Sequence, residues 1–130
     1  TLSIDDDPKT ILTAYIHEKI MHAKHDPDGS KIFASEVIHG APILKDYLHT
    51  EFKQWLDEKI TVIETWIEQG QIDVVNPYHL LFLIWSSTQH YADFNVQVLA
   101  GFGKEAMNDD DFDNVVESLT AIILKGCGLI

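Results

Sequence analysis

The amino-acid sequence predicts an all-α domain of five helices. Apolar residues recur at three- and four-residue steps along most of the chain, which is the spacing of one helix face. Asp7-Pro8 and Asn76-Pro77 each join a residue that caps helix N-termini to a proline suited to the first turn. With 130 residues, 45% of them hydrophobic, the chain is long enough for one domain with one core.

The first two helices are predicted on either side of a short break. The first begins at Pro8, and its apolar face holds Ile11, Leu12, Tyr15, Ile16, Ile20 and Ala23. Residues 25–29, His-Asp-Pro-Asp-Gly, are turn-forming and are expected to end it. A short helix over 30–39 follows, with Gly40 as its stop. Its inward residues are predicted to be Ile32, Phe33, Val37 and Ile38.

A long third helix is predicted over 41–69 and is ended by Gly70. At 1.5 Å per residue it would measure about 40 Å, which exceeds the width of such a domain. One end is therefore expected to extend past the local core. The apolar positions of this helix are Leu44, Leu48, Phe52, Trp55, Leu56, Ile60, Ile63, Trp66 and Ile67.

The last third of the chain predicts two helices and a loop. The fourth helix is expected over 77–95, and residues 96–108, which contain two glycines, are expected to form a loop. The fifth helix begins at Asp109-Asp110-Asp111, whose negative charge suits the positive end of a helix, and ends near Gly126. Its inward residues are predicted to be Phe112, Val115, Val116, Leu119, Ile122 and Ile123.

The charge composition excludes nucleic-acid binding by these residues alone. The net charge is -12, and all nine basic residues are lysine. Nucleic-acid binding depends on neutralising phosphates, which this surface would repel. The longest apolar run, residues 80–85, is far shorter than the roughly 20 residues that span a membrane. The single cysteine, Cys127, has no partner for an internal disulfide.

The seven histidines do not form a recognisable metal or catalytic motif. His17 and His22 are five residues apart, whereas two zinc ligands on one helix face need a spacing of four. No nucleophile elbow, phosphate-binding loop or dinucleotide fingerprint is present. The sequence therefore predicts a protein that is not an enzyme and that carries no metal or cofactor.

The fourth predicted helix changes character midway. Residues 80–85 are apolar on all sides, which indicates near-complete burial, but residues 86–94 are mostly polar. The helical repeat places two stripes on opposite sides, so this helix is expected to have a neighbour on each side. One stripe holds Phe82, Trp85, Gln89 and Asp93, and the other holds Leu80, Ile84, Ser87 and Tyr91.

Two explanations account for the polar half of this helix. In the first, the hydroxyl groups of residues 86–88 bond back to carbonyls one turn earlier, while Gln89 and His90 connect helices. In the second, Trp85 and Gln89 line a ligand pocket. A glutamine amide presents a donor beside an acceptor, which matches the edge of a nucleobase or a similar amide-like ring. The residues alone leave both explanations open.

Residues 79–94 resemble the penultimate helix of the TetR-family transcriptional regulators that control pyrimidine utilisation, most closely in Trp-x-Ser-Thr-Gln-His-Tyr-Ala-Asp-Phe. The resemblance spans nearly the whole chain. It also includes Tyr15-Ile16, Gly40-Ala41-Pro42-Ile43-Leu44, Leu56-Asp57-Glu58-Lys59, and Trp66 with Gly70. Residues 33–38 depart from the pattern, so one wall of the pocket is expected to differ.

The resemblance implies that residues 1–130 form a C-terminal effector-binding and dimerisation domain, with the DNA-reading helix-turn-helix domain outside them. It implies a cytoplasmic regulator that meets DNA only through that other domain, and a pyrimidine-like effector such as uracil or thymine. The last two helices would form a four-helix bundle across a homodimer. The implied ligand residues are Gln89, Trp85, Trp66 and Phe82, and the implied dimer residues are Ile84, Ser87, Tyr91, Leu119, Ile122 and Ile123.

Two other functions remain open at this stage. The chain could be a structural dimerisation module without a ligand, or a helical bundle that uses its histidines to hold a metal or cofactor.

Overall fold

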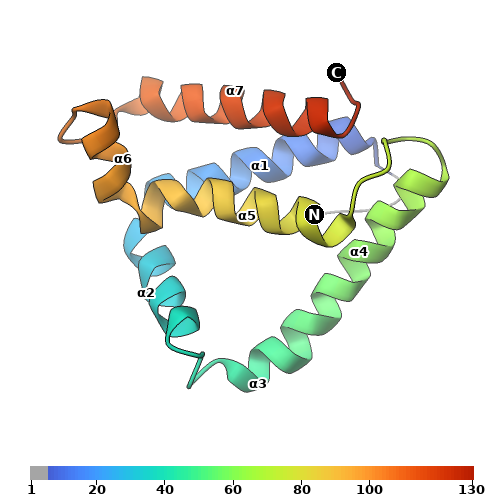
Figure 1. Cartoon of the computed structure of the whole chain (residues 1–130), viewed down its shortest axis with the longest axis horizontal. Coiled ribbons are helices and arrows are strands. Elements are labelled where there is room, and N and C mark those ends of the chain that lie inside the picture. Colours follow the sequence, from blue (N-terminus) through green and yellow to red (C-terminus); the bar gives the residue numbers. More distant parts are fainter. Residues whose placement is uncertain (1–5) are drawn as a thin grey trace.

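A computed structural model describes residues 6–130 and has an all-α fold, without a strand in that range, as the sequence predicted (Figure 1). The elements are α1 (Pro8–His25), α2 (Pro27–Ile38), α3 (Lys45–Tyr47), the π-helix η1 (Leu48–Phe52), α4 (Lys53–Glu68), α5 (Pro77–Asp93), α6 (Asn95–Phe102) and α7 (Asp109–Gly126). Because α3, η1 and α4 follow one another without a break, residues 6–130 hold six helical segments rather than the five expected. The additional segment is α6.

The predicted start signals act as expected at α1 and α5. The Asp7 carboxylate accepts a hydrogen bond from the Thr10 N–H at 3.0 Å, and the Asn76 side chain accepts one from the Tyr78 N–H at 3.0 Å. Each cap satisfies an amide that has no partner within its own helix. The prolines that follow supply helical backbone angles without losing a needed donor.

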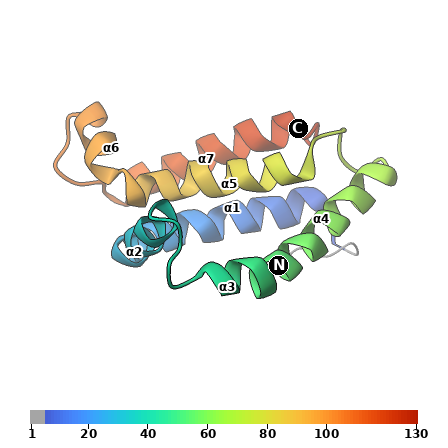
Figure 2. The same ribbon diagram turned by 60° about the horizontal axis from the view of Figure 1, so that its bottom comes forward.

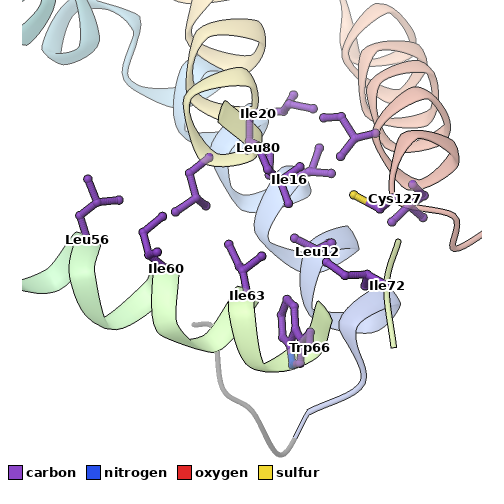
Figure 3. Close-up of a cluster of buried hydrophobic side chains, with 14 of the residues drawn as sticks. Leu12, Ile16, Ile20, Leu56, Ile60, Ile63, Trp66, Ile72, Leu80 and Cys127 are labelled. Atoms are coloured by element: carbon purple, nitrogen blue, oxygen red, sulfur yellow. The ribbon is translucent and has the colours of Figure 1, made fainter. Parts of the chain in front are cut away.

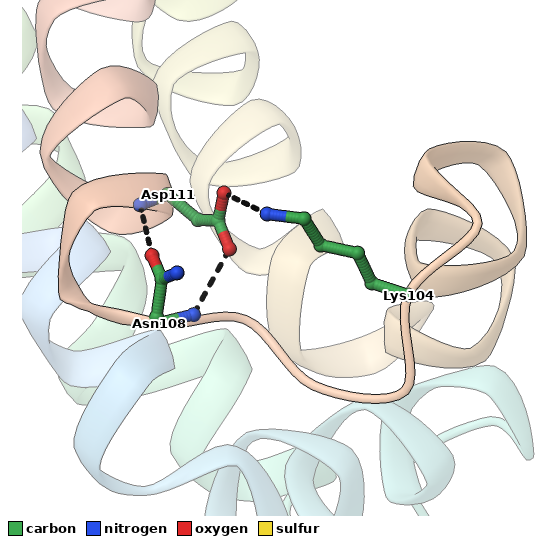
Figure 4. A network of polar contacts seen from close by, with 3 residues as sticks. All are labelled: Lys104, Asn108 and Asp111. Atoms are coloured by element: carbon green, nitrogen blue, oxygen red, sulfur yellow. Dashed lines mark hydrogen bonds and ion pairs between the residues drawn. The ribbon is translucent and has the colours of Figure 1, made fainter.

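Helix α7 begins with a reciprocal capping pair (Figure 4). The Asn108 side chain accepts from the Asp111 N–H at 2.9 Å, and the Asp111 carboxylate accepts from the Asn108 N–H at 2.9 Å. Lys104 donates to the same carboxylate at 2.7 Å. The hydrogen bonds from Lys104 and from the Asn108 backbone hold the pKa of Asp111 below its ordinary value. This arrangement connects the end of α6 to the start of α7.

Three helices form one side of the molecule, which we call the layer. Helix α1 packs along both α5 and α7, and in Figure 2 these two lie together above it. The chain then departs from the layer through α2, the turn 39–44, α3 and η1, a region (residues 27–52) that we call the corner. Helix α4 returns to the layer, so that α2, α3, α4 and α5 outline a triangle in Figure 1.

The hydrophobic core lies where the layer meets the second half of α4 (Figure 3). Its completely buried residues come from α1, α4 and α5: Leu12, Ile16, Ile20, Ile63, Trp66, Leu81 and Ile84. Val115, Ile123 and Leu124 of α7 and Cys127 close it on the far side. Burial of this many branched and aromatic side chains is the main source of stability in a domain of this size.

Three predicted boundaries are wrong. Only Asp26 interrupts the helix in the predicted break 25–29, because its side chain caps α2 and Pro27 occupies the first turn. The long helix starts at Lys45 instead of residue 41, and it contains the π-helix η1. Residues 96–108 are not all loop, because α6 extends to Phe102 and stops at the left-handed Gly103.

The turn between α2 and α3 explains the late start of the long helix. Gly40 and Ala41 both have positive φ angles, of 90° and 52°, and Ala41 is the one non-glycine residue with that conformation in residues 6–130. The Glu36 carboxylate accepts hydrogen bonds from the Ile43 and Leu44 N–H groups, at 2.7 and 2.9 Å. A side chain of α2 thus holds the turn directly before α3 and stabilises the corner.

Helix α2 does not bury the apolar residues predicted to face inward. Ile32 and Ile38 are 72% and 74% exposed, and Phe33 and Val37 are also exposed. The reason is that α2 packs on the layer mainly through its first turns, where Ser30 is buried and donates to the Asp93 carboxylate at 2.6 Å. On α7, Ile122 is likewise exposed, whereas the predicted inward residues Val115 and Ile123 are buried.

No helix in the part of the chain that the structure describes is both long and apolar enough to cross a membrane.

Candidate functional site

A cavity of about 750 Å³ is lined by residues of the layer, the corner and the start of α4. This volume falls within the range of small-molecule sites in proteins. Six of the helical elements supply its walls. The lining residues are Tyr15, Glu18 and Lys19 of α1, Phe33 and Val37 of α2, Tyr47 of α3, Leu48, His49 and Phe52 of η1, Trp55 of α4, and Trp85 and Gln89 of α5.

Aromatic rings form one wall of the cavity. Phe52, Trp55 and Trp85 lie with their ring centroids 5.8 to 6.4 Å apart, the spacing of favourable aromatic pairs. The π-helix η1 contributes to this wall, because Leu48 and Phe52 are its two ends and both line the cavity. Such π turns are frequently found at functional sites.

The indole of Trp85 is fixed by a hydrogen bond to α1. Its Nε1–H donates to the Tyr15 hydroxyl oxygen at 2.8 Å. Burial raises the pKa of the Tyr15 phenol, so this side chain stays neutral. The bond spans the layer from α5 to α1 and sets the orientation of the Trp85 ring beside the cavity.

Gln89 is the polar residue of α5 on the cavity wall, and its side chain is half-buried. No described residue forms a hydrogen bond with its amide group. The donor and the acceptor of this amide are therefore both available to a molecule in the cavity.

The hydroxyl groups before Gln89 are already used within the helix. Ser86 donates to the Leu83 carbonyl at 3.2 Å, and Ser87 and Thr88 donate to the Ile84 carbonyl at 3.3 and 2.7 Å. The hydroxyl part of the first explanation is thus confirmed, whereas neither Gln89 nor His90 connects α5 to another helix by a hydrogen bond within residues 6–130. The hydroxyls bond back along the helix, whereas Gln89 faces the cavity.

Two charged residues of α1 also line the cavity. Glu18 is exposed, and Lys19 is half-buried. Burial lowers the pKa of the Lys19 ammonium, while the charge of Glu18 acts in the opposite direction. Neither residue was assigned a functional role on the basis of the sequence. A detectable signal was the polar pair Tyr15 and Lys19, four residues apart on an otherwise apolar helix face.

Two residues expected at the ligand site lie elsewhere. Trp66 is completely buried in the core, and its indole nitrogen has no hydrogen-bond partner in residues 6–130. Phe82 is 44% exposed and does not line the cavity, although its ring lies 5.6 Å from that of Trp85. The stripe of Phe82, Trp85 and Gln89 is therefore split, because only its later members face the corner.

The residues expected at the dimer interface are also divided. Ile84 and Ile123 are buried in the core of their own chain, so they offer almost no surface to another molecule. Ile122 is 66% exposed, and Leu119, Ser87 and Tyr91 are half-buried. A surface groove between α5 and α7 contains Ile122 together with Leu83, which is 50% exposed and which the sequence did not single out.

The histidines do not gather into a metal-binding group in the part of the chain that the structure describes. Within residues 6–130, no group of three histidine, cysteine or acidic side chains is arranged to hold a metal ion. His90 packs its ring against Phe94 and Tyr91, with centroids 5.3 and 6.0 Å away, and does not join two helices through hydrogen bonds.

Comparisons with known proteins agree with this fold. The family model described as "YcdC-like protein, C-terminal region" matches residues 1–130. Proteins named HTH-type transcriptional regulator RutR, from Escherichia coli O157:H7, E. coli K12 and Shigella flexneri, are each 38% identical to the chain over 122 residues. The match covers 94% of the chain and 58% of each relative, so the chain spans somewhat more than half their length. These names describe transcriptional regulators and not enzymes. The chain therefore belongs to the family of YcdC-like C-terminal regions found in TetR-type transcriptional regulators.

Proposed function

We propose that this chain is the effector-binding and dimerisation region of a TetR-family regulator and that its effector is a small polar ring such as uracil or thymine. The observation that carries the proposal is the Gln89 amide, which lies on the cavity wall without a hydrogen-bond partner among the described residues. A ring with an N–H group beside a carbonyl would satisfy both halves of this amide.

The aromatic wall favours a planar ligand. A flat ring can stack against Trp85, whose orientation is held by Tyr15, and against the neighbouring Phe52 and Trp55 rings. The stacking would supply apolar contact, and the amide would supply the specificity, since burying a polar ring without hydrogen bonds is unfavourable.

Dimerisation is proposed through the side of α5 and α7 that faces away from α1. This side carries the groove with Leu83 and Ile122, and we assign the half-buried Leu119 and Ser87 to it. Pairing with the same groove of a second copy would cover these residues in a four-helix bundle, which is a self-complementary, two-fold arrangement. Tyr91 instead lines a hollow shared with Ala23 and Lys24 of α1.

Helix α5 would connect the two functions. Trp85 and Gln89 meet the cavity, whereas Leu83 meets the groove, so one helix contacts both the effector and the second subunit. An effector that binds one tilt of this helix more tightly shifts the dimer towards that tilt. In the whole regulator this would change the spacing of the two DNA-reading helices, which must match half-sites about one helical turn apart.

The test is calorimetric titration of the chain with uracil and thymine. We expect the unmodified chain to bind, and Gln89→Leu to reduce the affinity by about 100-fold, because the ring edge would lose both hydrogen bonds. Gln97→Leu is the matched control, since Gln97 is an exposed glutamine on α6 outside the cavity. Unchanged thermal unfolding would show that Gln89→Leu acts on binding and not on folding.

The second candidate, a dimerisation module without an effector, is favoured by the groove alone. It predicts that titration with uracil or thymine gives no heat of binding. It also predicts that the chain sediments as a dimer at micromolar concentration. A monomer in the same sedimentation experiment would contradict the dimerisation part of the proposal, whereas the titration tests the effector part separately.

A further inference from the structure

Lys19 is placed beside Gln89 by the geometry of the layer. Helices α1 and α5 run in the same direction in Figures 1 and 2, and the bond between Tyr15 and Trp85 fixes their register. Lys19 follows Tyr15 by four residues, as Gln89 follows Trp85 by four. Both residues therefore lie about one turn, or roughly 5 to 6 Å, further along their helices, on the wall of the same cavity.

The two half-buried lysines of α1, Lys19 and Lys24, differ in whether they have an ion-pair partner. Lys24 forms an ion pair with Asp109 at 2.7 Å and lies 5.6 Å from the centre of the Phe112 ring. Lys19 has no carboxylate within ion-pair distance in the part of the chain that the structure describes. Half-buried charged groups usually have a partner, because removing a charge from water is unfavourable. Lys19 is also the only lysine among residues 6–130 that lines this cavity.

We propose that Lys19 is a second ligand-binding residue of the cavity, whose ammonium group donates a charge-assisted hydrogen bond to an oxygen atom of the effector. This assignment rests on the proposed effector-binding function. It narrows the effector to rings that carry an exposed oxygen next to the amide-type edge recognised by Gln89. A second ring carbonyl satisfies this requirement, and so does a ring carboxylate.

The half-buried part of the cavity wall, which holds Lys19 and Gln89, supports an oxygen acceptor over a donor, and the acceptor Glu18 lies on the exposed part of the wall. Lysine can only donate, and the Tyr15 hydroxyl already accepts from Trp85. The Gln89 amide can serve one donor and one acceptor of the ligand. A ring whose remaining polar group was a second donor would face the ammonium and repel it, so the pair of Lys19 and Gln89 selects rings richer in carbonyl groups than in amino groups.

The experiment is calorimetric titration of three chains with two probes. The chains are the unmodified one, Lys19→Met, which keeps the alkyl stem and removes the charge, and Lys24→Met as the matched control on the same helix. The probes are uracil, which is neutral, and orotate, which is uracil with a ring carboxylate. Lys19→Gln, which keeps a polar group without the charge, serves as a second variant if Lys19→Met fails to fold.

We expect Lys19→Met to weaken at least one probe by about 10- to 100-fold, the range of a charged hydrogen bond, while Lys24→Met leaves both within about twofold. A larger loss for orotate than for uracil would identify a carboxylate as the preferred acceptor, and equal losses would identify the ring carbonyl. Unchanged affinities in Lys19→Met, with binding retained by the unmodified chain, would overturn the assignment and leave the proposed function standing. No binding by the unmodified chain would overturn both.

Discussion

The layer and the corner of this molecule use similar side chains in opposite ways. In the layer, apolar residues such as Ile16, Leu81 and Ile84 are completely buried. In the corner, Ile32, Ile38 and Ile43 are mostly exposed, and the helices meet the rest of the molecule along short stretches. The difference indicates that the two regions have separate roles: the layer provides stability, and the corner helps to enclose the cavity.

This division also explains where the cavity lies. A tightly packed protein interior leaves few voids larger than a water molecule, so a site for a ligand has to be built where packing is incomplete. Phe33 and Val37 of the corner face aromatic residues across the cavity instead of contacting a core. Their exposed apolar surface is available to a ligand, as is common in small-molecule sites.

The largest effect is expected from truncating one apolar side chain in each region. Leu81→Ala in the layer should lower the free energy of unfolding by about 3 kcal/mol, because it removes buried contacts and leaves a void. Ile38→Ala in the corner should lower it by less than about 0.5 kcal/mol, since that side chain is largely in water. Urea denaturation followed by circular dichroism measures both values.

Similar decreases in the free energy of unfolding for Leu81→Ala and Ile38→Ala would contradict this difference between the layer and the corner. They would mean that the exposed face of α2 is covered in solution, for example by another subunit. Repeating the denaturation at two protein concentrations separates these cases, because only an intermolecular contact makes the stability depend on concentration.

A smaller effect is expected from removing one side chain that binds backbone amides in each region. Asn108→Ala at the start of α7 should lower the global free energy of unfolding by about 1 kcal/mol, since α7 is part of the layer. Glu36→Ala should leave global stability nearly unchanged. It should instead speed hydrogen exchange of the Ile43 and Leu44 amides about fivefold, because the corner would open locally.

Asn114→Ala is the control for the first cap variant, as Asn114 is an exposed asparagine within α7. If Glu36→Ala lowered global stability as much as Asn108→Ala, the corner would unfold together with the layer. The two regions would then be a single cooperative unit.

The fold was largely predictable because its helices begin and end with strong local signals. The pairs Asp7-Pro8 and Asn76-Pro77 and the acidic start of α7 all mark real helix ends. Helix α6 was missed because Gly101 weakens the helical pattern, although Gly103 is the residue that ends the helix. Gly103, which ends α6, differs from Gly101 in its positive φ angle, and this angle cannot be read from the sequence.

The site was predictable only in part. The change from apolar to polar residues in α5 pointed to Trp85 and Gln89, and both line the cavity. The burial of Trp66 and Ile84 depends on how α1 packs against α4 and α5, which no single segment of the sequence specifies. Tyr15 and Lys19 form a polar pair that the sequence displays, but their place on the cavity wall next to Trp85 and Gln89 depends on the packing of α1 beside α5.

The π-helix η1 makes the cavity wall tolerant of one change in chain length. A π turn holds one residue more than an α turn, so the helix accommodates the additional residue without turning its two flanks relative to each other. Deleting one residue between Leu48 and Phe52 would let this turn return to ordinary α geometry, while Tyr47 and Trp55 keep their places on the cavity wall. Such a deletion should therefore alter the wall only at η1 itself.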